Sequence, residues 1–94
     1  MKIKWLSAAL ASRNSQLAYI AERDLQAAIT MGDAIEAAIR DLVDYPQIGR
    51  LGRVPGSREL VVRGTPYVIG YRLDPGRVVI LRVMHGAPRW PNKL

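Results

Sequence analysis

The chain has no cysteine, and it has one histidine among its 94 residues. Without cysteine there is no disulfide framework, no thiolate metal ligand and no cysteine nucleophile, and the composition suits a reducing compartment. One histidine and no cysteine also give the wrong ligand count for a zinc site. We therefore expect neither a metal site nor a cofactor.

Phenylalanine is absent as well, and aromatic residues make up only 6% of the chain. The apolar fraction is nevertheless 49%, so a packed core built from Ile, Leu, Val and Ala is expected. Ninety-four residues are enough for one small domain, and we predict a single domain over residues 1–94. A partner that covers part of so small a protein would stabilise it.

Long hydrophobic runs are missing from the sequence. The first residues, Met-Lys-Ile-Lys-Trp-Leu, are followed within a few positions by the polar stretch Ser12–Gln16. This pattern predicts neither a signal peptide nor a membrane span. We expect a cytoplasmic protein with no membrane partner.

Positive charge is scarce in the first half and concentrated in the second. Residues 1–45 carry five basic and six acidic side chains, 5 − 6 = −1, whereas residues 46–94 carry nine basic and two acidic ones, 9 − 2 = +7. Eight of those nine are arginine, which suits bidentate contacts with phosphate or carboxylate. The pattern favours an anionic partner, either nucleic acid or an acidic protein segment. A solvated basic face without a partner is the alternative.

The first element is predicted to be a short strand that leads into a helix. Lys2–Leu6 alternates between polar and apolar residues, as a half-buried strand does. Ser7 is expected to cap the following helix, because its hydroxyl can accept a bond from an amide of the first turn. That helix is predicted to end at about Arg23.

A second, more strongly amphipathic helix is predicted over Gln26–Val43. Its apolar residues recur at three- and four-residue steps, and Asp24 is a second candidate cap. Gly32 lies inside the pattern, which indicates either a close helix–helix approach or a local break. Pro46 is expected to end the helix, because the residue before a proline avoids the α region.

The second half is predicted to be a loop followed by three strands joined by tight turns. In order these are the loop Gln47–Ser57, the strand Arg58–Val62, the turn Arg63–Pro66, the strand Tyr67–Leu73, the turn Asp74–Gly76 and the strand Arg77–Met84. Tyr67 and Tyr71 share one strand face and are expected to pack beneath the helices, with stacking on bases as the alternative. The element order β-α-α-β-β-β predicts an α+β fold, an antiparallel sheet with an N-terminal helical hairpin packed on it.

Several short stretches, spread in order over nearly the whole chain, closely resemble the ParE-like branch of the RelE/ParE toxin superfamily. They are Tyr19–Asp24, Tyr45–Arg50, Arg58–Val62, Gly64–Ile69, Tyr71-Arg72 and Val79–Ala87. The resemblance implies a toxin of a type II toxin–antitoxin system. Its cognate antitoxin would neutralise it through an acidic amphipathic segment, in a toxin–antitoxin hetero-oligomer.

The resemblance leaves the cellular target open. Some members of the superfamily cleave messenger RNA in the ribosomal A site, whereas ParE-like members are associated with poisoning DNA gyrase. A relic that has lost toxicity and only binds its antitoxin is a third possibility.

The catalytic candidates are His85 and Arg82. Ribonucleases of the RelE type resemble one another in basic residues on the second and third strands and near the end of the last strand. The strand positions that correspond here hold Glu59, Val61 and Val68, none of which can neutralise a phosphate. His85, with an ordinary pKa near 6.5, is the one proton-transfer candidate, and Arg82 could contact phosphate. A structural histidine and an Arg82–Glu59 pair are the alternatives.

The candidate contacts to an antitoxin or a target are mostly arginines of the second half, together with one tryptophan. They are Arg50, Arg53, Arg58, Arg63, Arg72, Arg82, Arg89 and Trp90. Loops tolerate change and often present functional side chains, so the loop Gly49–Ser57 and the C-terminal stretch Gly86–Leu94 are the expected contact regions. Packing against the sheet is the alternative role of Trp90.

Overall fold

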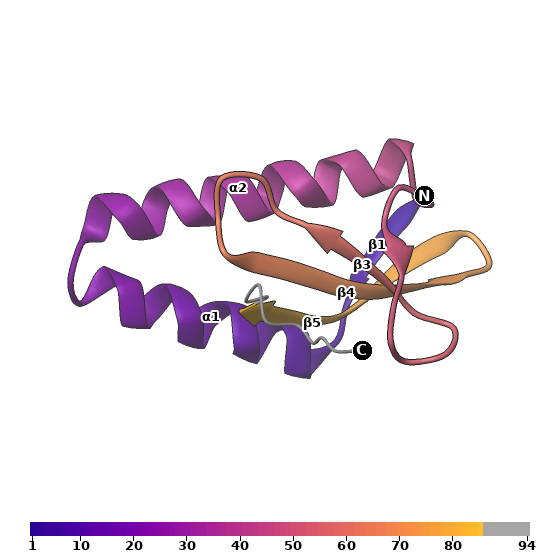
Figure 1. Cartoon of the computed structure of the whole chain (residues 1–94), viewed down its shortest axis with the longest axis horizontal. Coiled ribbons are helices and arrows are strands. Elements are labelled where there is room, and N and C mark those ends of the chain that lie inside the picture. The colour runs from indigo at the N-terminus through magenta and orange to yellow at the C-terminus, as the bar shows by residue number, and fades with distance from the viewer. Residues whose placement is uncertain (86–94) are drawn as a thin grey trace.

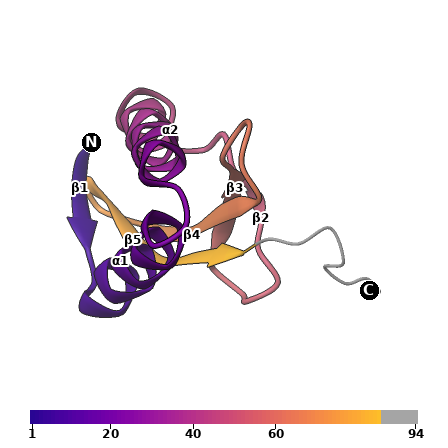
Figure 2. The same ribbon diagram turned by 90° about the vertical axis from the view of Figure 1, so that its left-hand side faces the viewer.

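Two helices lie on one face of a five-stranded sheet (Figures 1 and 2). The structure is a computed structural model that describes residues 1–85. Along the chain the elements are β1 (Lys2–Trp5), α1 (Ser7–Ala21), α2 (Leu25–Asp44), β2 (Arg50–Leu51), β3 (Arg58–Val61), β4 (Tyr67–Asp74) and β5 (Arg77–His85). The predicted α+β class and the helical hairpin packed on a sheet are confirmed.

The sheet is mixed, which corrects the expectation of a wholly antiparallel one. Its strand order is β1-β5-β4-β3-β2, and β2 to β5 pair in antiparallel fashion. β1 instead runs parallel to β5, with Lys2 opposite Arg77 and Trp5 opposite Ile80. A parallel pair needs a long connection, which the helical hairpin and the other strands supply. In this position Ile3 and Trp5 pack against the core.

The second helix begins and ends as predicted. The Asp24 carboxylate accepts a hydrogen bond from the Ala27 amide at 3.0 Å and so caps α2. At the other end Tyr45 has φ −132° and ψ 69°, outside the α region, as expected for the residue before Pro46. Neither helix of the described residues has the length and apolar character that a bilayer crossing requires.

The expected cap of the first helix is wrong. Ser7 is already the first helical residue, and the capping position is Leu6, whose side chain makes no capping bond. The Leu6 amide donates to the Ile80 carbonyl at 3.1 Å, so the β1–β5 pairing continues up to the helix start. The chain therefore enters α1 directly from the sheet, and no residue with a hydroxyl or carboxylate stands at the cap.

The core lies between the helices and one sheet face. Tyr67, Ile69 and Tyr71 of β4 point toward the helices and are at most 3% exposed, so the tyrosines pack there as predicted. The helices contribute mainly alanine and aliphatic side chains: Ala9, Ile35, Ala38, Ile39 and Leu42. Small helix residues bring the helices close to the large side chains of the sheet.

A β-bulge interrupts the pairing of β4 with β5. Gly70 lies opposite Arg82 and Tyr71 lies opposite Ile80, so Leu81 is an extra residue on β5. The residues that point toward the helices are therefore Ile80 before the bulge and Val83 after it, three positions apart. We call the side of the sheet away from the helices the open face.

Gly32 of α2 lies next to Leu17 of α1, where the two helices pack against each other. α2 continues through Gly32 without interruption, so the alternative of a local break is wrong. A Cβ at Gly32 would lie 3.6 Å from Leu17 Cδ1, an ordinary van der Waals contact. We expect Gly32→Ala to raise the free energy of unfolding by about 1 kcal/mol, measured by urea denaturation.

Gly49→Ala is the matched control for this prediction. A Cβ at Gly49 would lie 2.6 Å from the Tyr71 hydroxyl and 2.9 Å from the Glu59 carbonyl oxygen. Because neighbouring backbone must shift to make room, we expect a loss of about 1–3 kcal/mol. Equal effects of the two substitutions would contradict the packing described here.

Candidate functional site

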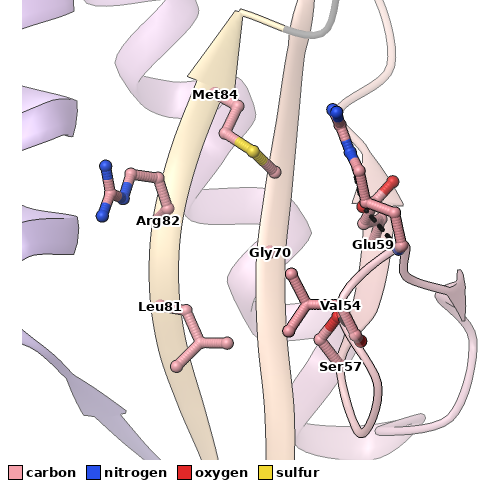
Figure 3. A pocket seen from close by; sticks show the side chains of 8 residues that line it. Val54, Ser57, Glu59, Gly70, Leu81, Arg82 and Met84 are labelled. Atoms are coloured by element: carbon pink, nitrogen blue, oxygen red, sulfur yellow. Dashed lines mark hydrogen bonds and ion pairs between the residues drawn. The ribbon is translucent and has the colours of Figure 1, made fainter. Parts of the chain in front are cut away.

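A buried carboxylate lies on the open face, on the strand next to the edge strand β2 (Figure 3). Glu59 of β3 is only 7% exposed. Its Oε1 lies 3.4 Å from Arg50 Nη2 and its Oε2 lies 3.9 Å from Arg53 Nε. The Arg53 amide also donates to Oε2 at 3.4 Å. An unpaired buried carboxylate would be costly, so these groups make the burial of Glu59 possible.

The loop that carries the two arginines is ordered by its own hydrogen bonds. The Gly52 amide donates to the Ser57 carbonyl at 2.8 Å, and the Ser57 hydroxyl donates to the Val54 carbonyl at 2.6 Å. Part of this predicted surface loop is in fact the short strand β2, in which Arg50 lies opposite Glu59. The loop therefore holds Arg53 and Val54 over the open face.

Tyr71 fixes the start of the same loop from the core side. Its hydroxyl donates to the Pro46 carbonyl at 2.8 Å and accepts from the Gly49 amide at 2.9 Å. Arg58 donates to the carbonyls of Gln47 and Gly49 at 3.2 and 2.8 Å. Burial raises the pKa of Tyr71 above its ordinary value, although the Gly49 bond and the charge of Arg58 act in the opposite direction.

A hollow of about 460 Å³ lies beside Glu59 on the open face. In register across the sheet, Glu59 faces Gly70 and Gly70 faces Arg82. Gly70 has no side chain, and the end of the Met84 side chain lies beside this position: a Cβ at Gly70 would be 3.2 Å from Met84 Cε. The hollow is lined by Arg53, Val54, Ser57, Glu59, Gly70, Leu81, Arg82 and Met84.

Arg82 does not pair with Glu59, contrary to one of the alternatives drawn from the sequence. In Figure 3 its side chain extends from β5 to the side away from Glu59. Within residues 1–85 the Arg82 guanidinium has no hydrogen bond or ion pair. Glu59 is held by Arg50 and Arg53 instead.

His85 lies on the opposite face from Arg82. Its ring meets the ring of buried Tyr67 edge to face, with centroids 5.7 Å apart and an interplanar angle of 88°. It lines a separate hollow with residues of α1 that include Gln16 and Tyr19. The sheet thus separates the two side chains that the sequence offered as a catalytic set.

The remaining predicted contact residues are distributed over the surface. Arg63 is exposed in the turn after β3 and lines a groove between α2 and β3. Arg72 is paired with Asp74 at 3.0 Å, and this hydrogen bond lowers the pKa of Asp74. Arg58 is used inside the fold, as described above. Arg89 and Trp90 lie outside the described residues.

The sequence did not reveal the hollow. Its floor depends on Gly70, and its walls include Val54 and Met84, which come from a loop and from the strand beyond the bulge. The one available signal was Glu59, an acidic residue in an otherwise apolar strand that follows an arginine-rich loop.

The geometry defines a class of small α+β protein with helices on one sheet face and an arginine-flanked surface on the other. Residues 3–90 match the family model of the ParE toxin of the type II toxin-antitoxin system, parDE. The chain therefore belongs to this toxin family, within the RelE/ParE superfamily.

Known relatives are similar over most of their length. The chain is 40% identical to the candidate toxin Y4kP of Sinorhizobium fredii, over 99% of this chain and 96% of that one. It is 37% identical to the toxin RelE2 of Caulobacter vibrioides, over 92% and 96% of the two chains. A chain from the structure of the chromosomal ParDE TA system from P. aeruginosa shares the fold, with a TM-score of 0.78, 24% identity and coverage of 88% and 92%.

Tyr71→Phe tests the anchor of the loop. The change leaves the Gly49 amide and the Pro46 carbonyl without their partner, so we expect a loss of about 1–3 kcal/mol in the free energy of unfolding. Tyr19→Phe, which removes the hydroxyl of an exposed tyrosine, is the control and should change stability little.

The pH dependence of stability provides a second measurement on the same variant. Because the pKa of Tyr71 is raised in the folded state, the unfolded chain loses this proton first as pH rises. Wild-type stability should therefore hold below pH about 10 and fall above it. The fall should be shallower in Tyr71→Phe, in which Tyr67 is the remaining tyrosine with a raised pKa. Urea midpoints that fall equally steeply with pH in the two proteins would contradict this account.

Proposed function

We propose that this protein is a ParE-like growth inhibitor that acts on DNA gyrase by binding, and that a cognate antitoxin neutralises it. The observation that carries the proposal is the separation of His85 from Arg82 by the sheet. General acid–base cleavage of RNA needs a proton-transfer group and a cation that reach the same phosphate. Here the chain's one histidine faces the helices and the arginine faces away from them.

The negative charge of Glu59 on the open face supports the same proposal. A cleavage site of the RelE type would place positive side chains there to neutralise the phosphate. This protein has the buried carboxylate of Glu59, flanked by Val61 and Val68 in the neighbouring cross-strand pair. The relatives carry both ParE and RelE names, so it is this geometry that favours the ParE-like branch.

The groove beside Arg63 is the surface we assign to the antitoxin. It runs between α2 and β3, and apart from Asp41 and Arg63 its lining is apolar: Ala34, Ala37, Ala38, Ile48, Leu60 and Val61. An apolar groove with a cation at its margin suits an amphipathic segment that carries acidic residues. The charge of +7 in residues 46–94 would attract such a segment over a longer range.

Purified DNA gyrase provides the direct test of the target. We expect the wild-type protein to inhibit supercoiling of a relaxed plasmid, and His85→Gln to inhibit equally. Loss of a general acid or base would lower a cleavage rate by roughly two to four orders of magnitude, so a catalytic role of His85 would be measurable in His85→Gln. Messenger cuts in the ribosomal A site by the wild type, lost in His85→Gln, would instead establish the ribonuclease. A folded protein that inhibits neither gyrase nor translation would be a relic.

The antitoxin surface can be tested by thermal unfolding with the product of the adjoining reading frame. A partner that binds only the folded state raises the midpoint in proportion to the logarithm of its excess over Kd. We expect Arg63→Ala to weaken this effect and added salt to weaken it further. Arg23→Ala, at the far end of the hairpin where Arg23 stacks on Tyr19, should leave it unchanged. Equal behaviour of the two variants would place the antitoxin elsewhere.

A further inference from the structure

We infer that Glu59 is a built-in anion that fills a phosphate-binding position on the open face and so makes this face reject RNA. Glu59 is thereby a specificity-determining residue that acts by occupying the site itself. The inference goes beyond the proposed function, because it concerns what the open face excludes and does not depend on which protein the toxin inhibits.

The groups around the Glu59 carboxylate are those that would hold a phosphate. Two guanidinium groups, of Arg50 and Arg53, and the Arg53 amide all approach its two oxygens at 3.4 to 3.9 Å. Guanidinium groups and backbone amides bind carboxylate and phosphate oxygens by the same geometry. A carboxylate that is already there competes with any external anion for these donors.

The local concentration of the internal carboxylate is high because the fold holds it rigidly. The side chain of Glu59 is 8% exposed, whereas those of Arg50 and Arg53 are 55% and 59% exposed. The donors are thus accessible to solvent while their ligand is buried beneath them. Arg50 is also fixed opposite Glu59 by the pairing of β2 with β3.

There is room for a larger anion beside this carboxylate. The hollow of about 460 Å³ begins at Glu59 and extends over Gly70 toward Arg82, which lies in register on β5. Its charged lining residues are Arg53, Arg82 and Glu59, a local charge of 2 − 1 = +1. Without the charge of Glu59 this becomes +2, and Glu59 no longer competes with an external anion.

The test compares Glu59→Gln with Asp74→Asn. Both substitutions replace a carboxylate that is paired with arginine, and both raise the net charge by one, but Asp74 lies away from the hollow. The probes are a fluorescent single-stranded oligouridylate, measured by anisotropy, and inorganic phosphate at constant ionic strength, measured by thermal unfolding. We expect Glu59→Gln to bind the oligonucleotide roughly tenfold more tightly than the wild type. Asp74→Asn should stay close to the wild type.

Thermal unfolding in the presence of phosphate is the second measurement on these variants. Phosphate should raise the unfolding midpoint of Glu59→Gln and leave that of the wild type unchanged relative to chloride, since a ligand that binds only the folded state stabilises it. Glu59→Asp keeps the charge and should behave as the wild type does. Equal gains in Glu59→Gln and Asp74→Asn would show a general charge effect and overturn the inference.

If Glu59→Gln does not fold, the inference can be tested on the wild-type protein alone. Amide chemical shifts of Ser57, Gly70 and Arg82 are followed while phosphate or the oligonucleotide is added. Chemical shifts that do not change support a site already occupied by Glu59. Shift changes of these amides that saturate would refute the inference. Saturable binding together with undiminished inhibition of gyrase would refute this inference and leave the proposed function intact.

Discussion

The arrangement of the site depends on one extra residue in β5. The bulge at Leu81 lets Ile80 and Val83 both face the helices, and it turns Arg82 and Met84 to the open face. With regular alternation from Ile80 onward, Arg82 would point into the apolar core, where an unpaired guanidinium is costly. The bulge therefore lets apolar side chains fill the core and places Arg82 on the open face and His85 on the helix side.

The arginines of the second half serve several different purposes. Arg58 donates to backbone carbonyls inside the fold, and Arg50 and Arg53 hold the buried carboxylate of Glu59. Only part of the positive charge thus remains for a partner to meet, including that of Arg63 and Arg82, which line surface hollows. The net charge of a sequence indicates attraction to anions, but it does not say which arginines meet them.

Local signals in the sequence were sufficient for most elements and insufficient for their arrangement. Asp24, Pro46 and the turn at Gly76, with φ 75°, act through neighbouring backbone, so their effects could be predicted. The bulge was not predicted, because the run from Val78 to Met84 is apolar on both faces except at Arg82. The parallel partner of β1 and the burial of Glu59 likewise arise from residues that are distant along the chain.

The pairing of the first strand with the last has a consequence for synthesis of the protein. Lys2 finds its partner Arg77 only when 77 − 2 = 75 further residues have been made. Translation adds about 5–20 residues per second, so the N-terminal strand waits for several seconds with its edge unsatisfied. The core cannot close before β5 leaves the ribosome, because Val78, Ile80 and Val83 are part of it. A nascent chain therefore cannot present the folded open face until β5 has been made.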